Sequence, residues 1–86
     1  MLSSCQIRAA RALLRWSADE LARSSGIGVA TIRRIELVEG VPSCNARTLE
    51  RLKEPLEAAG VEFIGTPENN PGVRLLKSRV DQVETK

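Results

Sequence analysis

The chain has 86 residues, a formal net charge of +2 and two aromatic residues, Trp16 and Phe63. A chain of this length forms one small domain, which buries only about 60–65% of the surface that its unfolded chain exposes. It has no histidine, and Cys5 and Cys44 lie far apart, which excludes His-based acid–base chemistry and a Cys/His metal cluster.

The first predicted helix begins with a capping box. Ser3 is followed three residues later by Gln6, the spacing at which two side chains satisfy each other's backbone N–H groups. Ile7, Ala10 and Leu14 then recur at helical spacing. The segment "SSCQIRAARALLR" is therefore predicted to form an amphipathic helix.

Two more short helices are predicted on either side of a glycine turn. In "SADE", Ser17 and Glu20 form a second capping box, and Gly26 suits the left-handed position that ends a helix. The next helix occupies about residues 28–38 and ends before the Gly and Pro that follow. The pattern predicts a pair of helices joined by a tight turn.

A fourth helix is predicted to begin near Asn45, a good N-cap residue, and to end at Gly60. Its apolar stripe consists of Leu49, Leu52, Leu56 and Ala59. Pro55 lies inside this pattern, where it removes a backbone hydrogen bond at a cost on the order of 3 kcal/mol. We expect a kink at Pro55 or a helix that breaks in two.

The pattern changes after residue 60. "VEFI" (61–64) and "VRLL" (73–76) have strand composition, and "GTPENNPG" between them is rich in turn residues. An isolated two-stranded hairpin is marginal in water, so it must pack on the helices or pair with another chain. We expect a strand element over 61–77 and a loosely ordered polar tail over 78–86.

The predicted strands are the candidate dimer interface, either by exchanging edges or by packing face to face. The apolar residues assigned to this interface are Val61, Phe63, Ile64, Val73 and Leu75. Whether the hairpin pairs within one chain or between two chains stays open at this point.

All of the net charge lies in residues 1–60, which hold eight arginines and one lysine. The planar fork of arginine matches phosphate groups and guanine edges better than an ammonium group does. In a helix-turn-helix, the second helix lies in the major groove and its N-terminal residues meet base edges. The residues assigned to that helix tip and its flank are Gly28, Val29, Ala30, Thr31, Arg33 and Arg34.

Residues 4–60 resemble the XRE-type helix-turn-helix regulators, the family of the Cro and phage-repressor DNA-binding domains. That family has a Ser-Gln-Glu-Glu-Leu-Ala start, a glycine turn and a recognition helix that ends Ile-x-x-Ile-Glu. This chain has "SADELA" followed by "SGIGVATIRRIE", and later "VPS" and "RTLERL". The downstream "LEAAGVEFI" and "GVRLL" resemble small bacterial members of the family that add a C-terminal β element.

The resemblance implies a mainly α fold of four to five helices, a repressor-like DNA-binding domain over 1–60, with a short C-terminal hairpin or strand pair. It implies an ion pair between Arg11 and Glu36. It also places Asn45 and Arg47 where the family's loop touches backbone phosphate, while Ser17 both caps its helix and presents N–H groups to phosphate.

The chain departs from the family pattern at Ala18 and Val29, where many members have glutamine. Without those amides, direct readout relies on apolar contacts with thymine methyl groups and on Arg33 and Arg34.

Structural alternatives exist for several of these residues. Ile32 and Ile35 are expected in the core, and Arg11 with Glu36 is expected to be a structural pair. Arg33 and Arg34 are alternatively a solvated face. Asn45 is equally well a plain N-cap.

The favoured function is a sequence-specific DNA-binding regulator, a repressor that binds double-stranded DNA at a palindromic operator as a homodimer. The alternative is a module such as an antitoxin or anti-activator, which binds a protein partner through its C-terminal strands. We expect no enzyme and no cofactor, because no nucleophile–base pair is visible. No apolar run approaches the ~20 residues of a membrane span, so we expect a soluble, cytoplasmic protein without a disulfide.

Overall fold

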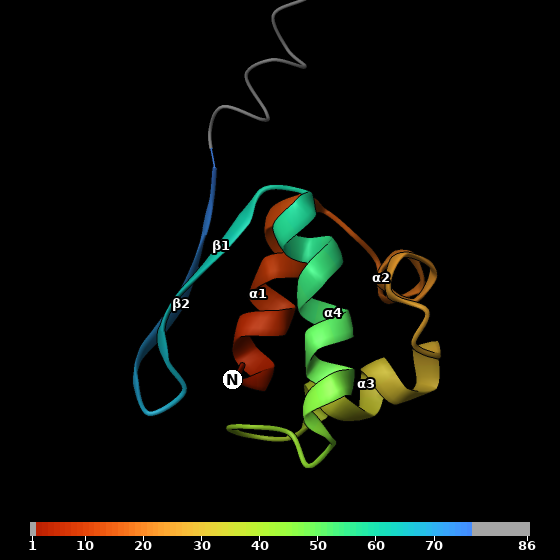
Figure 1. Cartoon of the computed structure of the whole chain (residues 1–86), viewed down its shortest axis with the longest axis horizontal. Coiled ribbons are helices and arrows are strands. Elements are labelled where there is room, and N and C mark those ends of the chain that lie inside the picture. The colour runs from red at the N-terminus through yellow and green to blue at the C-terminus, as the bar shows by residue number, and fades with distance from the viewer. Residues whose placement is uncertain (1, 77–86) are drawn as a thin grey trace, which may run out of the picture.

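The computed structural model describes residues 2–76, which form four helices followed by a two-stranded antiparallel sheet (Figure 1). The helices are α1 (Ser4–Leu14), α2 (Ala18–Ser25), α3 (Val29–Leu37) and α4 (Ala46–Ala58), and the strands are β1 (Val61–Thr66) and β2 (Asn69–Leu75). The predicted helix-rich fold with a C-terminal strand pair is confirmed. None of these helices is both long and apolar enough to cross a membrane. The predicted tail over 78–86 lies outside the described residues.

The predicted capping boxes of the first two helices and the glycine end of the second are confirmed. Ser3 and Gln6 form the capping box of α1, and Ser17 and Glu20 form that of α2. Gly26 ends α2 in the left-handed conformation, with φ of 78°. These local interactions satisfy backbone groups that a helix end leaves unpaired, and therefore they fix where each helix begins and ends.

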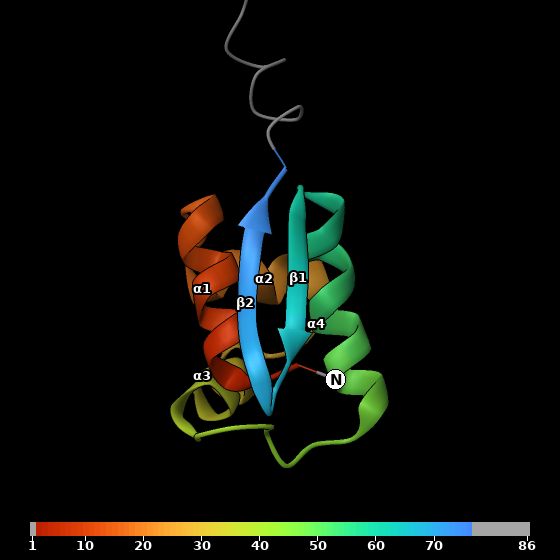
Figure 2. The same cartoon turned by 90° about the vertical axis from the view of Figure 1, so that its left-hand side faces the viewer.

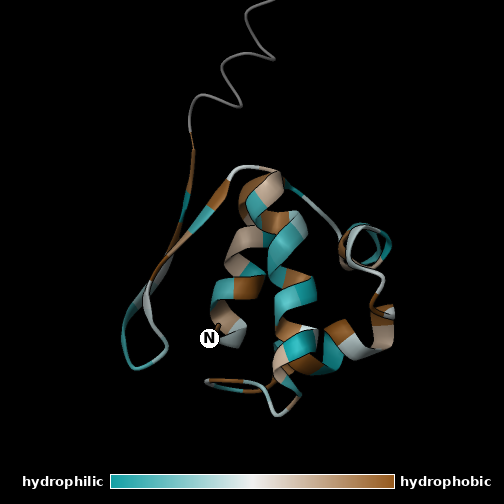
Figure 3. Cartoon of the chain, in the orientation of Figure 1, coloured by the Kyte–Doolittle hydropathy of each residue, from teal (hydrophilic) through white to brown (hydrophobic). Residues whose placement is uncertain are grey.

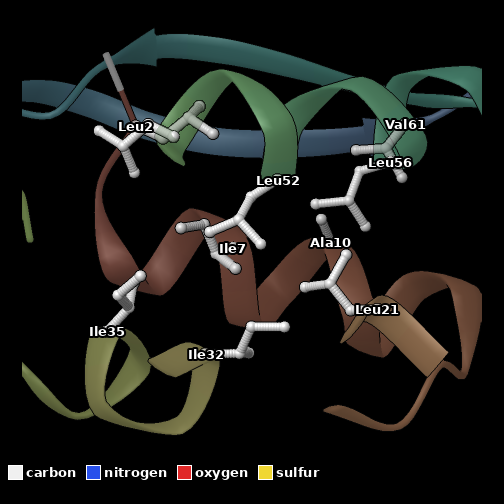
Figure 4. Close-up of a cluster of buried hydrophobic side chains, with 10 residues drawn as sticks. Leu2, Ile7, Ala10, Leu21, Ile32, Ile35, Leu52, Leu56 and Val61 are labelled. Atoms are coloured by element: carbon white, nitrogen blue, oxygen red, sulfur yellow. The ribbon is translucent and has the colours of Figure 1, made fainter. Parts of the chain in front are cut away.

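The core lies between α1, α3 and α4 and is closed by α2 and the sheet. Its buried apolar side chains are Leu2, Ile7, Ala10, Leu21, Ile32, Ile35, Leu49, Leu52, Leu56 and Val61, most of them labelled in Figure 4. Hydrophobic and hydrophilic residues alternate along α4 in Figure 3, as expected for a helix with one buried face. The aliphatic core predicted from composition is confirmed.

Of the kink or break expected at Pro55, the break is wrong, because α4 runs without interruption from Ala46 to Ala58. Pro55 lies only three residues before the end of the helix. The backbone N–H of Ala59 still donates to the carbonyl of Pro55 at 3.0 Å. Burial of Leu52 and Leu56 on either side of the proline holds this turn against the core, which offsets the lost hydrogen bond.

The hairpin is longer and its turn tighter than the sequence predicts. Only residues 67–68 separate the strands, and the register shifts between Ile64 and Thr66 at Gly65. Gly65 has φ of 73°, and a Cβ there would collide with the carbonyl oxygen of Asn70. Glycine at this bulge therefore allows the strands to continue through a segment whose composition indicates a loop.

The sheet covers α1 and α4, with β2 beside α1 and β1 beside α4 (Figure 2). Gln6, which is only 2% exposed, joins the sheet to α1, because its Nε2 donates to the carbonyls of Ile64 and Gly72 at 3.0 Å each. The predicted strand element is thus part of the same packed unit as the helices, and its two strands pair within one chain.

The dimer interface predicted on the strands needs a correction. Val61 is 2% exposed and belongs to the core of its own chain. Phe63, Val73 and Leu75 are half-buried and pack against the same core. The alternation of side chains along a strand places all four on the face that covers the helices, which leaves only Ile64 of the predicted set on the outer face.

Candidate nucleic-acid interface

Residues 26–28 connect α2 to α3 in a tight turn. The left-handed conformation of Gly26 reverses the chain, and the Ser25 side chain accepts a hydrogen bond from the backbone N–H of Ile27 at 3.1 Å. The buried Leu21 of α2 and Ile32 of α3 then join the same core cluster. The turn therefore leads the chain from a packed α2 into a separately packed α3.

The helix α3 has one buried and one exposed face. Ile32 and Ile35 are buried, which confirms their predicted place in the core. Ala30, Arg33 and Arg34 are exposed, whereas Val29 and Thr31 are half-buried. The 3.6-residue period accounts for this division, and it presents small side chains at the helix start and two arginines behind them.

Arg33 and Arg34 form no ion pair with any residue between 2 and 76. By contrast, Arg74 is paired with Glu62 at 2.7 Å. Two adjacent guanidinium groups on one exposed helical face leave their donors available for an external anion or acceptor.

The N-terminal end of α3 is also free of competing groups. Gly28 is its N-cap and supplies no side-chain hydrogen bond, and the first turn holds no acidic residue. In α2, by contrast, the first turn holds Asp19 and Glu20, and the Glu20 carboxylate accepts from the N–H of Ser17 at 2.8 Å. The start of α3 is therefore the better place for a phosphate, while Ser17 is engaged in capping.

The other end of α3 is held firmly against α1. Arg11 donates from Nε and Nη2 to the two carboxylate oxygens of Glu36, each at 2.8 Å, and from Nη1 to the carbonyl of Trp16. The hydrogen bonds to Glu36 raise the pKa of Arg11, although burial opposes this. Ser4 adds a buried hydrogen bond from Oγ to the carbonyl of Ile35 at 2.7 Å. The ion pair implied by the resemblance is confirmed, and its effect is to fix the orientation of α3.

The start of α4 contributes a second group of polar residues. Asn45 Oδ1 accepts from the backbone N–H and the hydroxyl of Thr48, at 2.9 and 3.0 Å, which confirms the N-cap interpretation. Arg47 is exposed. Arg51, one turn further, reaches the α2–α3 connection, since a Cβ on Gly26 would lie 2.8 Å from its Nη2. The sequence indicates Arg47 but gives no sign that Arg51 reaches this turn.

Sequence reasoning also missed Ser4, and it assigned Gln6 only to the capping box; the buried hydrogen bonds of both residues join parts of the chain more than 30 residues apart. No local pattern in the sequence predicts such partners.

Cys5 and Cys44 are both free thiols, and Cys5 is exposed. Within residues 2–76 no three metal-ligating side chains are grouped together. No protein-family model, no curated protein and no solved structure matches this chain.

Proposed function

We propose that this protein is a sequence-specific DNA-binding regulator in which α2 and α3 act as a helix-turn-helix. The observation that carries this proposal is that Arg33 and Arg34 are exposed and form no ion pair within residues 2–76, on a helix whose far end is fixed by Arg11 and Glu36. A helix that is already held in place suits the reading of base edges by exposed guanidinium groups, because less conformational entropy is lost when it binds.

Each part of α3 then has a task in the major groove, which is about 12 Å wide. Val29 and Ala30 are small enough for the helix tip to approach thymine methyl groups, and Thr31 donates to a base or a phosphate. Arg33 or Arg34 binds guanine O6 and N7 in bidentate fashion, an interaction worth about 1–3 kcal/mol of discrimination. Arg47 binds the phosphate backbone beside the groove.

A single copy of this small domain offers a limited number of base contacts. Single DNA-binding modules bury roughly 600–1,000 Å² of protein surface, whereas specific binding usually needs more. A homodimer on a palindromic operator, with half-sites about one helical turn apart, doubles the contacts. Occupation of such a site by a bound dimer excludes other proteins from the same stretch of DNA, which favours repression.

The proposal is tested by selecting bound duplexes from fragments of the source genome and footprinting the best one. We expect a symmetric protected site whose affinity falls when Arg33 and Arg34 are both replaced by alanine. Equal retention of all fragments, with no enrichment over several rounds, would contradict sequence-specific binding.

The alternative, a protein-binding module that acts through its C-terminal strands, has less surface available. The inner face of the hairpin packs on α1 and α4, and the outer face carries the Glu62–Arg74 ion pair beside Ile64. A partner that binds this chain unchanged after substitution of Arg33 and Arg34, together with unchanged regulation in vivo, would favour the alternative.

A further inference from the structure

Leu37, the last residue of α3, is 82% exposed. The next most exposed large apolar side chain among the described residues is Leu76, at 42%, and Val38 beside Leu37 is exposed as well. An isolated surface leucine is ordinary, but this one stands at the end of the helix that Arg11 and Glu36 hold rigid. It is a fixed apolar projection.

A small apolar pocket lies close by in the chain, between residues 41–44 and the first turns of α4. Its volume is about 150 Å³, and Figure 4 shows Leu2, one of its lining residues, at the end of the core near α4. The apolar lining consists of Leu2, Val41, Pro42, Cys44, Ala46 and Leu49. Glu50 and Lys53 also line it and are its two charged residues.

We propose that a second copy of this chain fills the pocket, with Leu37 of each copy inserted into the pocket of the other about a two-fold axis. An apolar cavity of roughly 150 Å³ accepts a group the size of benzene, which is comparable to a leucine side chain. Only residues 38–40 separate Leu37 from Val41, the first pocket-lining residue that follows it in the chain, and reciprocal insertion about a two-fold axis closes the assembly as a dimer. This inference rests on the homodimer of the proposed function and names its interface.

DNA is a poorer partner for Leu37. The residue lies about two turns after Val29, roughly 12 Å along the helix axis from the tip that enters the groove. At that distance the duplex presents mainly phosphate and sugar. These groups are bound through hydrogen bonds, which a leucine side chain cannot form. Burial in an apolar pocket, by contrast, is worth about 1.5–3 kcal/mol for a leucine, a factor of roughly ten to a hundred in affinity.

The charges beside the projection and the pocket are complementary. Glu39, two residues after Leu37, forms no ion pair within residues 2–76, and Lys53 of the pocket is only loosely paired with Glu57, at 3.8 Å. Glu50 also lines the pocket and would repel Glu39, but Arg33, one turn before Leu37, supplies it with an opposite charge, which leaves Arg34 as the arginine that reads guanine. Each charged residue at the contact therefore has an opposite charge to meet.

Sedimentation velocity over about 1–200 μM protein tests the interface. We expect a concentration-dependent dimer whose dissociation constant rises at least about tenfold in Leu37→Ser and in Ala46→Trp, which blocks the pocket. Leu13→Ser, at another exposed leucine on α1, is the matched control and leaves dimerisation unchanged. Circular dichroism verifies that each variant is folded. A wild-type monomer throughout, an unchanged dimer in Leu37→Ser, or open-ended assembly would overturn the inference.

Charge reversal provides a second test. Lys53→Glu weakens the dimer, and adding Glu39→Lys restores it; a double variant no better than the single one contradicts the proposed pairing. Binding to a duplex with one half-site separates this inference from the proposed function. Leu37→Ser retains half-site affinity if Leu37 contacts only the second copy, and a loss matching that of Arg34→Ala would instead make Leu37 a DNA contact and overturn the interface.

Discussion

The side chains of Arg11 and Glu36, 25 positions apart in the chain, form a bidentate ion pair with both N–O distances at 2.8 Å. Their side chains are 22% and 8% exposed, so the pair is largely shielded from water. Arg11 also donates to the carbonyl of Trp16. One residue of α1 thus ties the end of α3 to the segment that precedes α2, and the relative placement of all three helices depends on it.

Removal of one member of this pair is expected to destabilise the fold. Arg11→Met leaves the Glu36 carboxylate buried without a partner, at a cost on the order of 3 kcal/mol, or roughly 12–24 °C in Tm for a domain of this size. Urea denaturation followed by circular dichroism measures the change. The double variant Arg11→Met/Glu36→Leu recovers much of the loss, because no charge is left buried. Arg74→Gln, at the exposed pair, costs less than about 1 kcal/mol; an equally large loss there would contradict this account.

Replacement of an exposed arginine on α3 is expected to weaken DNA binding without unfolding the protein. If Arg34 reads a guanine, Arg34→Ala lowers the affinity for the selected site roughly ten- to a hundredfold. If Arg34 instead contacts a phosphate, the substitution reduces the slope of log affinity against log salt concentration by about one. Fluorescence anisotropy at several salt concentrations separates these two cases. Arg8→Ala, the same charge change on α1, is the control. Equal losses in both variants would indicate only a general charge effect.

Loss of the Gln6 amide is expected to release the hairpin from the helices. In Gln6→Glu a carboxylate faces the carbonyl oxygens of Ile64 and Gly72, and both donated hydrogen bonds are lost. A buried polar group left without a hydrogen-bond partner costs about 1–3 kcal/mol of stability, and a buried charge facing like partial charges costs more. Hydrogen exchange should then show reduced protection in β1 and β2 before α4. Glu62→Gln, on the exposed face of the hairpin, leaves protection unchanged; a uniform loss across all elements would mean that the hairpin does not open separately.

Gly65 and Gly40, two of the glycines with a left-handed backbone, are expected to differ in their tolerance of alanine. Both substitutions strain the backbone by about 1–2 kcal/mol, since φ is 73° and 75° respectively. Only at Gly65 does the new methyl group meet the backbone of Asn70, which adds about 1–3 kcal/mol. Thermal unfolding of Gly65→Ala and Gly40→Ala measures the difference. Equal shifts in Tm would show that the close approach at the bulge is absent.

Local chemistry in the sequence was enough to place the helices. The capping boxes at Ser3 and Ser17, the left-handed Gly26 and the Asn45 cap act over three or four residues, so their partners are visible in the sequence. The resemblance to a known family added the Arg11–Glu36 pair, whose geometry agrees. It did not reveal the Ser4 hydrogen bond, which joins segments far apart in the chain.

The strands show where that local information ends. Turn-forming residues in 65–72 indicate a loop, yet the bulge at Gly65 and the anchor at Gln6 extend the hairpin through most of it. The same packing turned Val61 from a predicted dimer contact into a core residue. Side-chain alternation specifies two faces of a strand, but which face is buried depends on the helices that meet it.

The sequence by itself therefore determined the order and ends of the helices, the aliphatic core and the residues available at the tip of α3, because helix caps and the 3.6-residue period act at short range. Only the tertiary structure decided that α4 continues through Pro55, that the hairpin covers its own chain, and that Leu37 remains exposed while residues 41–44 and α4 enclose an apolar pocket. These outcomes depend on packing between segments that are distant in the chain. The free energy of that packing outweighs the local conformational preferences of the residues, and the spacing of residues along the chain does not show it.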